Sequence, residues 1–182
     1  LYGKAAGSGW GGWMKPGKYV PAGRILVVDG NKSVFGFGRE PAFFAQSHVL
    51  EYQLFSAKGG VYKRGDWRKV FKNIKNKEAS ITNWKQNRAL PVRKLSAIQF
   101  NWRNVNPPLL VRAMVGANDK LIIAGPPDIL DETKLHNRFL DPAVTRQIKK
   151  QEDAVEGKIG GIMWVVSAGN GRKISVIKIA SL

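Results

Sequence analysis

The most constraining feature of this sequence is a series of short apolar runs separated by glycine, proline and asparagine turns. Runs such as residues 25–28 and 162–166 have the length of a β-strand, and no run approaches the ~18 residues that a membrane-spanning helix needs. The turn after residue 168 contains Asn170-Gly171, a pair that tolerates the positive φ of tight hairpins. The pattern therefore predicts a mainly β fold made of antiparallel strands.

The apolar runs form two groups with the same internal order. We expect a first unit over 23–107 and a second over 108–182, after a Gly- and Trp-rich loop over 1–22. Each unit is predicted to hold four strands. The expected strands are 24–29, 33–39, 51–56 and 97–102 in the first unit, and 109–115, 120–124, 160–168 and 174–180 in the second.

One helix is expected inside the second unit, within an insertion over 128–157. Asp141 is a favourable N-cap, Pro142 suits the first helical position, and Gly157 is placed to end the helix. An apolar stripe at helical spacing is expected to pack onto the sheets. Its members are Val144, Ile148 and Val155.

The segment over 58–96 carries much of the chain's excess positive charge. It contains twelve Lys or Arg against Asp66 and Glu78, which is more than half of the net charge of +17. Trp67, Phe71 and Trp84 are interleaved with these cations. We expect an insertion that is either a solvated loop with aromatic anchors or a polyanion-binding surface, since cations and aromatic rings together bind nucleic acid. The possible polyanion-binding residues are Lys63, Arg64, Arg68, Lys69, Lys72, Lys75, Lys77, Lys85 and Arg88.

The second unit resembles a known repeat. Residues 120–125 read KLIIAG and residues 161–173 read GIMWVVSAGNGRK, and together they resemble the repeat of pyrroloquinoline-quinone (PQQ)-like β-propellers. Trp164 and Val166 stand at the strand positions of that repeat, and Gly171 stands in its tight turn. Residues 23–57 with 97–103 look like a second copy. The stretches 2–13, 24–39, 51–55 and 110–128 also resemble the C-terminal part of large exported bacterial propeller proteins.

The resemblance implies antiparallel four-stranded blades of an incomplete β-propeller. Each blade of a propeller stacks on two neighbours, and about two blades leave apolar faces and sheet edges uncovered. We therefore expect a fragment whose ring is completed by other blades of the propeller or by another protein chain. The resemblance to exported proteins implies a periplasmic or extracellular location in the cell envelope.

Few residues suit catalysis or metal binding. The chain has no cysteine, which excludes disulfides, thiol nucleophiles, attached c-type haem and cysteine zinc sites. His48 and His136 each lack a second ligand at metal spacing. Asp128, Asp131 and Glu132 lack the spacing of a Ca²⁺ loop, and roles in turns and helix caps suit them better. No catalytic, cofactor-binding or metal-binding residue and no cofactor is therefore assigned.

The expected function is that of a non-catalytic β-propeller segment, a scaffold or binding surface in an exported or cell-envelope assembly. PQQ-dependent dehydrogenases need a catalytic carboxylate, Ca²⁺ and, in many members, a vicinal cysteine pair, which this chain lacks. Two alternatives stay open. The chain is part of such an enzyme whose site lies in absent blades, or it is a polyanion-binding protein that uses the basic insertion.

Overall fold

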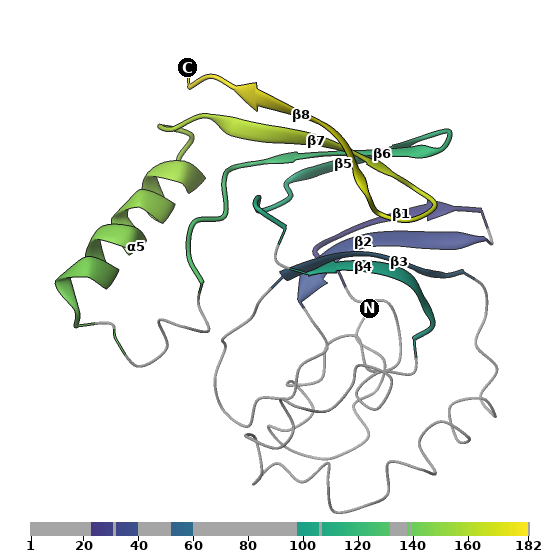
Figure 1. Cartoon of the computed structure of the whole chain (residues 1–182), viewed down its shortest axis with the longest axis horizontal. Coiled ribbons are helices and arrows are strands. Elements are labelled where there is room, and N and C mark those ends of the chain that lie inside the picture. Colours follow the sequence, from purple (N-terminus) through teal and green to yellow (C-terminus); the bar gives the residue numbers. More distant parts are fainter. Residues whose placement is uncertain are drawn as a thin grey trace, which may run out of the picture.

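Two antiparallel sheets and one helix make up the described part of the protein (Figure 1). The computed structural model describes residues 23–30, 32–39, 52–59, 98–105, 107–131, 138 and 140–181. The expected mainly β fold is confirmed, with two four-stranded sheets that do not close. The loop over 1–22 and nearly all of the basic segment over 58–96 lie outside the described residues.

The first sheet is a meander in chain order. It contains β1 (Ile25–Asp29), β2 (Ser33–Arg39), β3 (Tyr52–Lys58) and β4 (Phe100–Val105), and every neighbouring pair is antiparallel. Side chains alternate between the two faces of a strand. The register places Phe35, Phe37, Leu54 and Trp102 on one face, where all four are buried.

The second sheet repeats this meander. It contains β5 (Ala113–Ala117), β6 (Lys120–Gly125), β7 (Gly161–Ser167) and β8 (Lys173–Ile179). Asn118, with a φ of 52°, lies in the turn between β5 and β6, and Gly171, with a φ of 70°, lies between β7 and β8. Both residue types adopt this left-handed conformation readily. The predicted turn over 169–172 is confirmed, and its positive φ belongs to Gly171.

The two sheets pack face to face, with the core between them. β1 lies against β5, and Cγ1 of Val27 is 3.5 Å from the position that a Cβ atom would take on Gly116. Burying an aliphatic or aromatic side chain contributes about 1.5–3 kcal/mol, so this layer is the main source of stability. Its buried residues are Phe35, Phe37, Leu54, Trp102, Leu109, Val111, Met114, Leu121, Ile123 and Val166.

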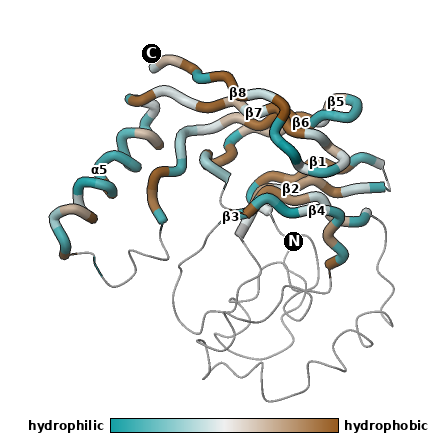
Figure 2. The backbone as a smooth tube through the Cα atoms, in the orientation of Figure 1, coloured by the Kyte–Doolittle hydropathy of each residue, from teal (hydrophilic) through white to brown (hydrophobic). Residues whose placement is uncertain are grey.

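The helix α5 (Pro142–Val155) begins as the sequence predicts. Asp141 is the N-cap, and its Oδ1 accepts a hydrogen bond of 2.8 Å from the Ala143 N–H, while Pro142 occupies the first helical position. The chain reverses just beyond the helix at Gly157, which has a φ of 83°. The helix is mostly hydrophilic, whereas apolar residues concentrate on the strands (Figure 2).

Gln151 attaches α5 to the segment that follows β6. Its Oε1 accepts hydrogen bonds from the N–H groups of Ile129 and Leu130, at 2.7 and 3.2 Å. Its Nε2 donates to the Pro127 carbonyl at 3.0 Å. One side chain therefore satisfies three backbone groups of this segment.

The expectation that α5 packs a Val144, Ile148 and Val155 stripe onto the sheets is wrong. The helix lies beyond one end of the second sheet (Figure 1). Val144 is buried and Ile148 is half-buried, but Val155 is 38% exposed and Ala154 is buried in its place. Polar contacts also attach the helix, through Gln151 and through a hydrogen bond of 3.1 Å from the Arg112 Nη2 to the Val155 carbonyl. A search for apolar periodicity overlooks both.

The strands that differ most from their predicted bounds are β5 and β4. The strand expected over 109–115 begins at Ala113, because Leu109 and Leu110 lie opposite Pro127 and Pro126, which have no N–H to donate. The strand expected over 97–102 is β4, displaced toward the C-terminus. A bulge in its pairing with β3 falls between Ser56 and Ala57.

Candidate functional site

The predicted polyanion-binding residues, from Lys63 to Arg88, all lie outside the described part of the chain. Lys58, the first basic residue of that segment, is described and is the exposed last residue of β3. His48, His136 and Glu132 also lie outside. The polyanion-binding surface therefore stays a prediction from the sequence.

Asp128 and Asp131, two of the acidic residues weighed as Ca²⁺ ligands, lie in the segment that follows β6. The Asp128 N–H donates a hydrogen bond of 3.0 Å to the Pro108 carbonyl. Within the described ranges, no group of three or more His, Cys, Asp or Glu residues could hold a metal ion. Asp128 thus has a backbone role in joining the segment after β6 to the segment before β5.

Trp102 joins the fourth strand of the first sheet to the last turn of the second. Its Nε1–H donates a hydrogen bond of 2.8 Å to the Ala168 carbonyl. Its ring covers Gly171, where a Cβ atom would fall 2.4 Å from Cε3 of the indole. Glycine is required at residue 171 for two reasons, the left-handed φ and this close ring. The contact fixes how the two sheets lie on each other.

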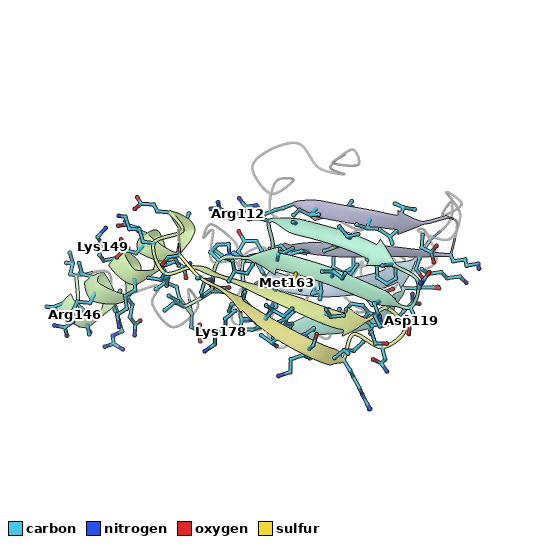
Figure 3. The ribbon with its side chains drawn as sticks, turned by 90° about the horizontal axis from the view of Figure 1, so that it is seen from above. Arg112, Asp119, Arg146, Lys149, Met163 and Lys178 are labelled. Atoms are coloured by element: carbon cyan, nitrogen blue, oxygen red, sulfur yellow. The ribbon has the colours of Figure 1, made fainter. Side chains whose placement is uncertain are left out.

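The second sheet has a second, open face. We call the side that points away from the first sheet the outer face, and Met163 lies near its centre (Figure 3). Val115, Ile177 and Ile179 are 57%, 49% and 48% exposed there. The register assigns thirteen residues to this face: Ala113, Val115, Ala117, Lys120, Ile122, Ala124, Gly161, Met163, Val165, Ser167, Ser175, Ile177 and Ile179.

The composition of the outer face is unusual for a surface in contact with water. Lys120 is its one charged member, and nine of the thirteen residues are Val, Ile, Met or Ala. The opposite face of the same sheet is also apolar, with Leu121, Ile123 and Val166 buried. Antiparallel sheets that meet water on one side normally alternate apolar and polar residues. The second sheet instead has the composition of a middle layer.

Few charged residues border the outer face. Lys120 lies on the face, and Arg172 lies in the turn before β8. Lys178 pairs with Ile162 and therefore belongs to the opposite face, and the Arg112 Nη2 donates a hydrogen bond of 3.1 Å to the Val155 carbonyl. Asp119 is the acidic residue in these bordering positions, and its carboxylate lies 3.9 Å from the Lys120 Nζ. The described part of this border therefore carries no strong excess of one charge.

The acidic groups around α5 are held in their ionised form. The Ala143 N–H, followed by Arg138, lowers the pKa of Asp141 below its usual value. Hydrogen bonds from Lys149 and Lys158 lower the pKa of Asp153, and Lys158 lowers the pKa of Glu156. These shifts favour surface ion pairs rather than a carboxylic acid that donates protons.

Comparison with known proteins adds no relative. The chain matches no protein-family model, no curated protein and no solved structure. Among the described residues, no helix has the length and apolar character needed to cross a membrane.

The sequence predicted uncovered apolar sheet faces but did not identify the residues of the outer face. The available signal was the unbroken run Ile162-Met163-Trp164-Val165-Val166. A continuous apolar run within a strand indicates burial on both faces. The pairing register was needed to show which of these residues is left open.

Proposed function

We propose that this chain is a non-catalytic β-scaffold, formed by two consecutive blades of a propeller-like ring in an exported or cell-envelope assembly. The stacking of two four-stranded meanders carries the proposal, because their first strands, β1 and β5, lie against each other. Blades of a propeller are meanders of this kind, arranged radially with their first strands around the centre.

The interface between the sheets supports the same proposal. The buried layer contains large side chains from both sheets, and the hydrogen bond from Trp102 to the Ala168 carbonyl adds a directional contact. Such an interface holds two sheets in one orientation and so suits a scaffold. The apolar composition of both faces of the second sheet further supports a place between two neighbours.

The described residues offer no observation that favours the alternative functions. The basic segment lies outside them, and the shifted acidic groups of α5 are surface ion pairs. The scaffold is therefore the function that the geometry supports best.

The proposal is tested with the purified full-length protein, PQQ and Ca²⁺. PQQ binding is measured by calorimetry, and turnover by reduction of dichlorophenolindophenol with primary alcohols and aldoses as substrates. A PQQ-dependent dehydrogenase serves as the positive control. We expect neither stoichiometric binding nor dye reduction above a blank without protein. Binding of one PQQ per chain with dye reduction would refute a non-catalytic role.

A further inference from the structure

The turn between β7 and β8 contains Asn170-Gly171, which is the one Asn-Gly pair of the sequence. We infer that Asn170 is a self-modification site, which loses its side-chain amide when this turn opens and which the closed turn protects. The inference concerns the chain's own chemistry and goes beyond the proposed scaffold function. Three observations carry it: the exposure of the amide, the hydrogen bonds of the reacting groups, and the ring that covers the glycine.

The reaction needs only these two neighbouring residues and water. The Gly171 backbone nitrogen attacks Cγ of Asn170, and the new C–N bond closes a succinimide ring. The bond between Cγ and Nδ2 breaks, and Nδ2 leaves as ammonia with the proton that the glycine nitrogen loses. Water then opens the ring at either of its two carbonyl carbons. The products are aspartate, with the original backbone, and isoaspartate, whose backbone runs through the former side chain.

The Asn170 side chain lies where this chemistry can begin. Asn170 is exposed, so water reaches the amide. Gly171 has no side chain to hinder the attack by its nitrogen and rotates freely once the turn opens. Asn118 provides a comparison, because it is also exposed in a hairpin turn but precedes Asp119, whose side chain hinders the same attack. Asn170 is therefore the more reactive of the two turn asparagines.

The closed turn engages both reacting groups in hydrogen bonds. The Gly171 N–H donates to the Ser167 carbonyl at 2.8 Å. The Asn170 Oδ1 accepts a hydrogen bond of 2.9 Å from the Arg172 N–H, which limits rotation of the side chain. Attack requires the glycine nitrogen to lose its proton and turn toward Cγ, so its bond to Ser167 breaks first. The reaction therefore proceeds from a locally opened turn.

The ring of Trp102 controls how easily this turn opens. It covers Gly171 so closely that a Cβ atom there would lie 2.4 Å from Cε3. The Nε1–H of the same ring donates to the Ala168 carbonyl at 2.8 Å. Rotation of the glycine peptide group beneath the ring disturbs this packing. The contact between the two sheets therefore sets the population of the open turn and, through it, the rate of deamidation.

The isoaspartate product does not restore the contact between the sheets. It inserts one further C–C bond of about 1.5 Å between residues 170 and 171. The turn is closed by a hydrogen bond of 2.9 Å from the Ser167 N–H to the Arg172 carbonyl, and Gly171 has no spare room beneath Trp102. The aspartate product keeps both the backbone and an oxygen that accepts from the Arg172 N–H. Formation of isoaspartate is therefore a one-way record that the turn has opened.

The experiment measures deamidation at residue 170 in the full-length protein in mildly alkaline buffer, which favours loss of the glycine proton. The folded protein, the same protein in guanidinium chloride, and the variants Trp102→Phe and Gly36→Ala are incubated in parallel. Trp102→Phe keeps a ring but removes the Nε1–H donor. Gly36→Ala is the matched control, because its Cβ clashes with Phe55, which belongs to a separate buried cluster. Peptide mapping by mass spectrometry separates asparagine, aspartate and isoaspartate, and urea unfolding gives the stability of each variant.

We expect Asn170 to deamidate about ten-fold or more slowly in the folded protein than in guanidinium chloride. Trp102→Phe should raise the rate in the folded protein several-fold, whereas Gly36→Ala should leave it unchanged. Asn118 should react more slowly than Asn170 in the denatured chain. The variant Asn170→Asp should keep the melting temperature of the parent protein, whereas the purified isoaspartate form should melt at a lower temperature.

Four results would overturn the inference. The first is an equal rate in the folded and denatured protein, and the second is no reaction at residue 170 in the denatured protein. The third is equal acceleration by Trp102→Phe and Gly36→Ala, which would assign the reaction to global unfolding rather than to the turn. The fourth is an isoaspartate form that melts at the same temperature as the Asn170→Asp variant.

Discussion

The replacement Gly171→Ala tests the contact that fixes the two sheets. Gly171 has a φ of 70°, and a Cβ atom there would lie 2.4 Å from Cε3 of Trp102. The left-handed conformation costs an alanine about 1 kcal/mol. Overlap with a packed ring costs about 1–3 kcal/mol more. The free energy of unfolding should therefore fall by about 2–4 kcal/mol.

Gly157 provides the matched control for the backbone part of this cost. It has a φ of 83° and no atom within 4 Å of the position that a Cβ would take. Gly157→Ala should lower the free energy of unfolding by about 1 kcal/mol, because only the conformational cost applies. The difference between the two variants isolates the overlap with Trp102.

A double-mutant cycle with Trp102→Ala completes the experiment. The single change Trp102→Ala should cost about 3–5 kcal/mol, since it removes a large buried ring. In that background, Gly171→Ala should cost only about 1 kcal/mol, which gives a coupling of about 1–3 kcal/mol. Urea unfolding is followed by far-UV circular dichroism, because losing a tryptophan alters the fluorescence. Equal costs of Gly171→Ala in both backgrounds would refute the contact between the sheets.

Three further predictions concern single elements. Gln151→Ala should lower the free energy of unfolding by about 1–3 kcal/mol and speed hydrogen exchange at the backbone amides of residues 129 and 130, which its side chain binds. Gln147→Ala, on the exposed side of α5, should change neither quantity, and equal exchange rates in the two variants would contradict the attachment. Gly36→Ala should lower the free energy of unfolding by about 1–3 kcal/mol, since its Cβ would lie 2.4 Å from Cζ of Phe55. In a Phe55→Leu background the same change should lower it by less. An equal loss in both backgrounds, measured by urea unfolding, would contradict the clash. The pKa of Asp141 is lowered in the folded protein, so its carboxylate stabilises the helix at pH values above its ordinary pKa of 3.8. This stabilisation is lost as the pH falls through the lowered pKa of the folded state. Asp141→Asn should remove the part of the loss of helical circular dichroism at low pH that Asp141 causes. An unchanged dependence of the dichroism on acidic pH would contradict the capping role.

Much of the fold was predictable from residues that act locally. Asp141 and Pro142 specify the start of α5 through capping and a fixed φ, and the structure begins the helix there. The strand predicted over 33–39 has the same bounds as β2, since Ser33 follows a turn and the apolar residues alternate. These features depend on near neighbours in the chain.

The features that sequence reasoning missed depend on residues distant in the chain. The strand expected from residue 109 begins at Ala113 because Pro126 and Pro127 lie opposite, a pairing that only the folded structure specifies. The place of α5 involves a hydrogen-bonded Gln151 that an apolar stripe does not reveal. The outer face emerges only when the register assigns Met163 and Ile177 to one side.

The central claim is that the two sheets form one stacked unit with β1 against β5. Nuclear Overhauser effects in the full-length protein test it most directly. We expect cross-peaks from a Val27 methyl group to the Gly116 Hα atoms, and from the Trp102 ring to the Gly171 Hα atoms, which the ring current should also shift. Strand-to-strand cross-peaks within each sheet, with neither of these contacts between the sheets, would contradict the stacked pair and the scaffold built on it.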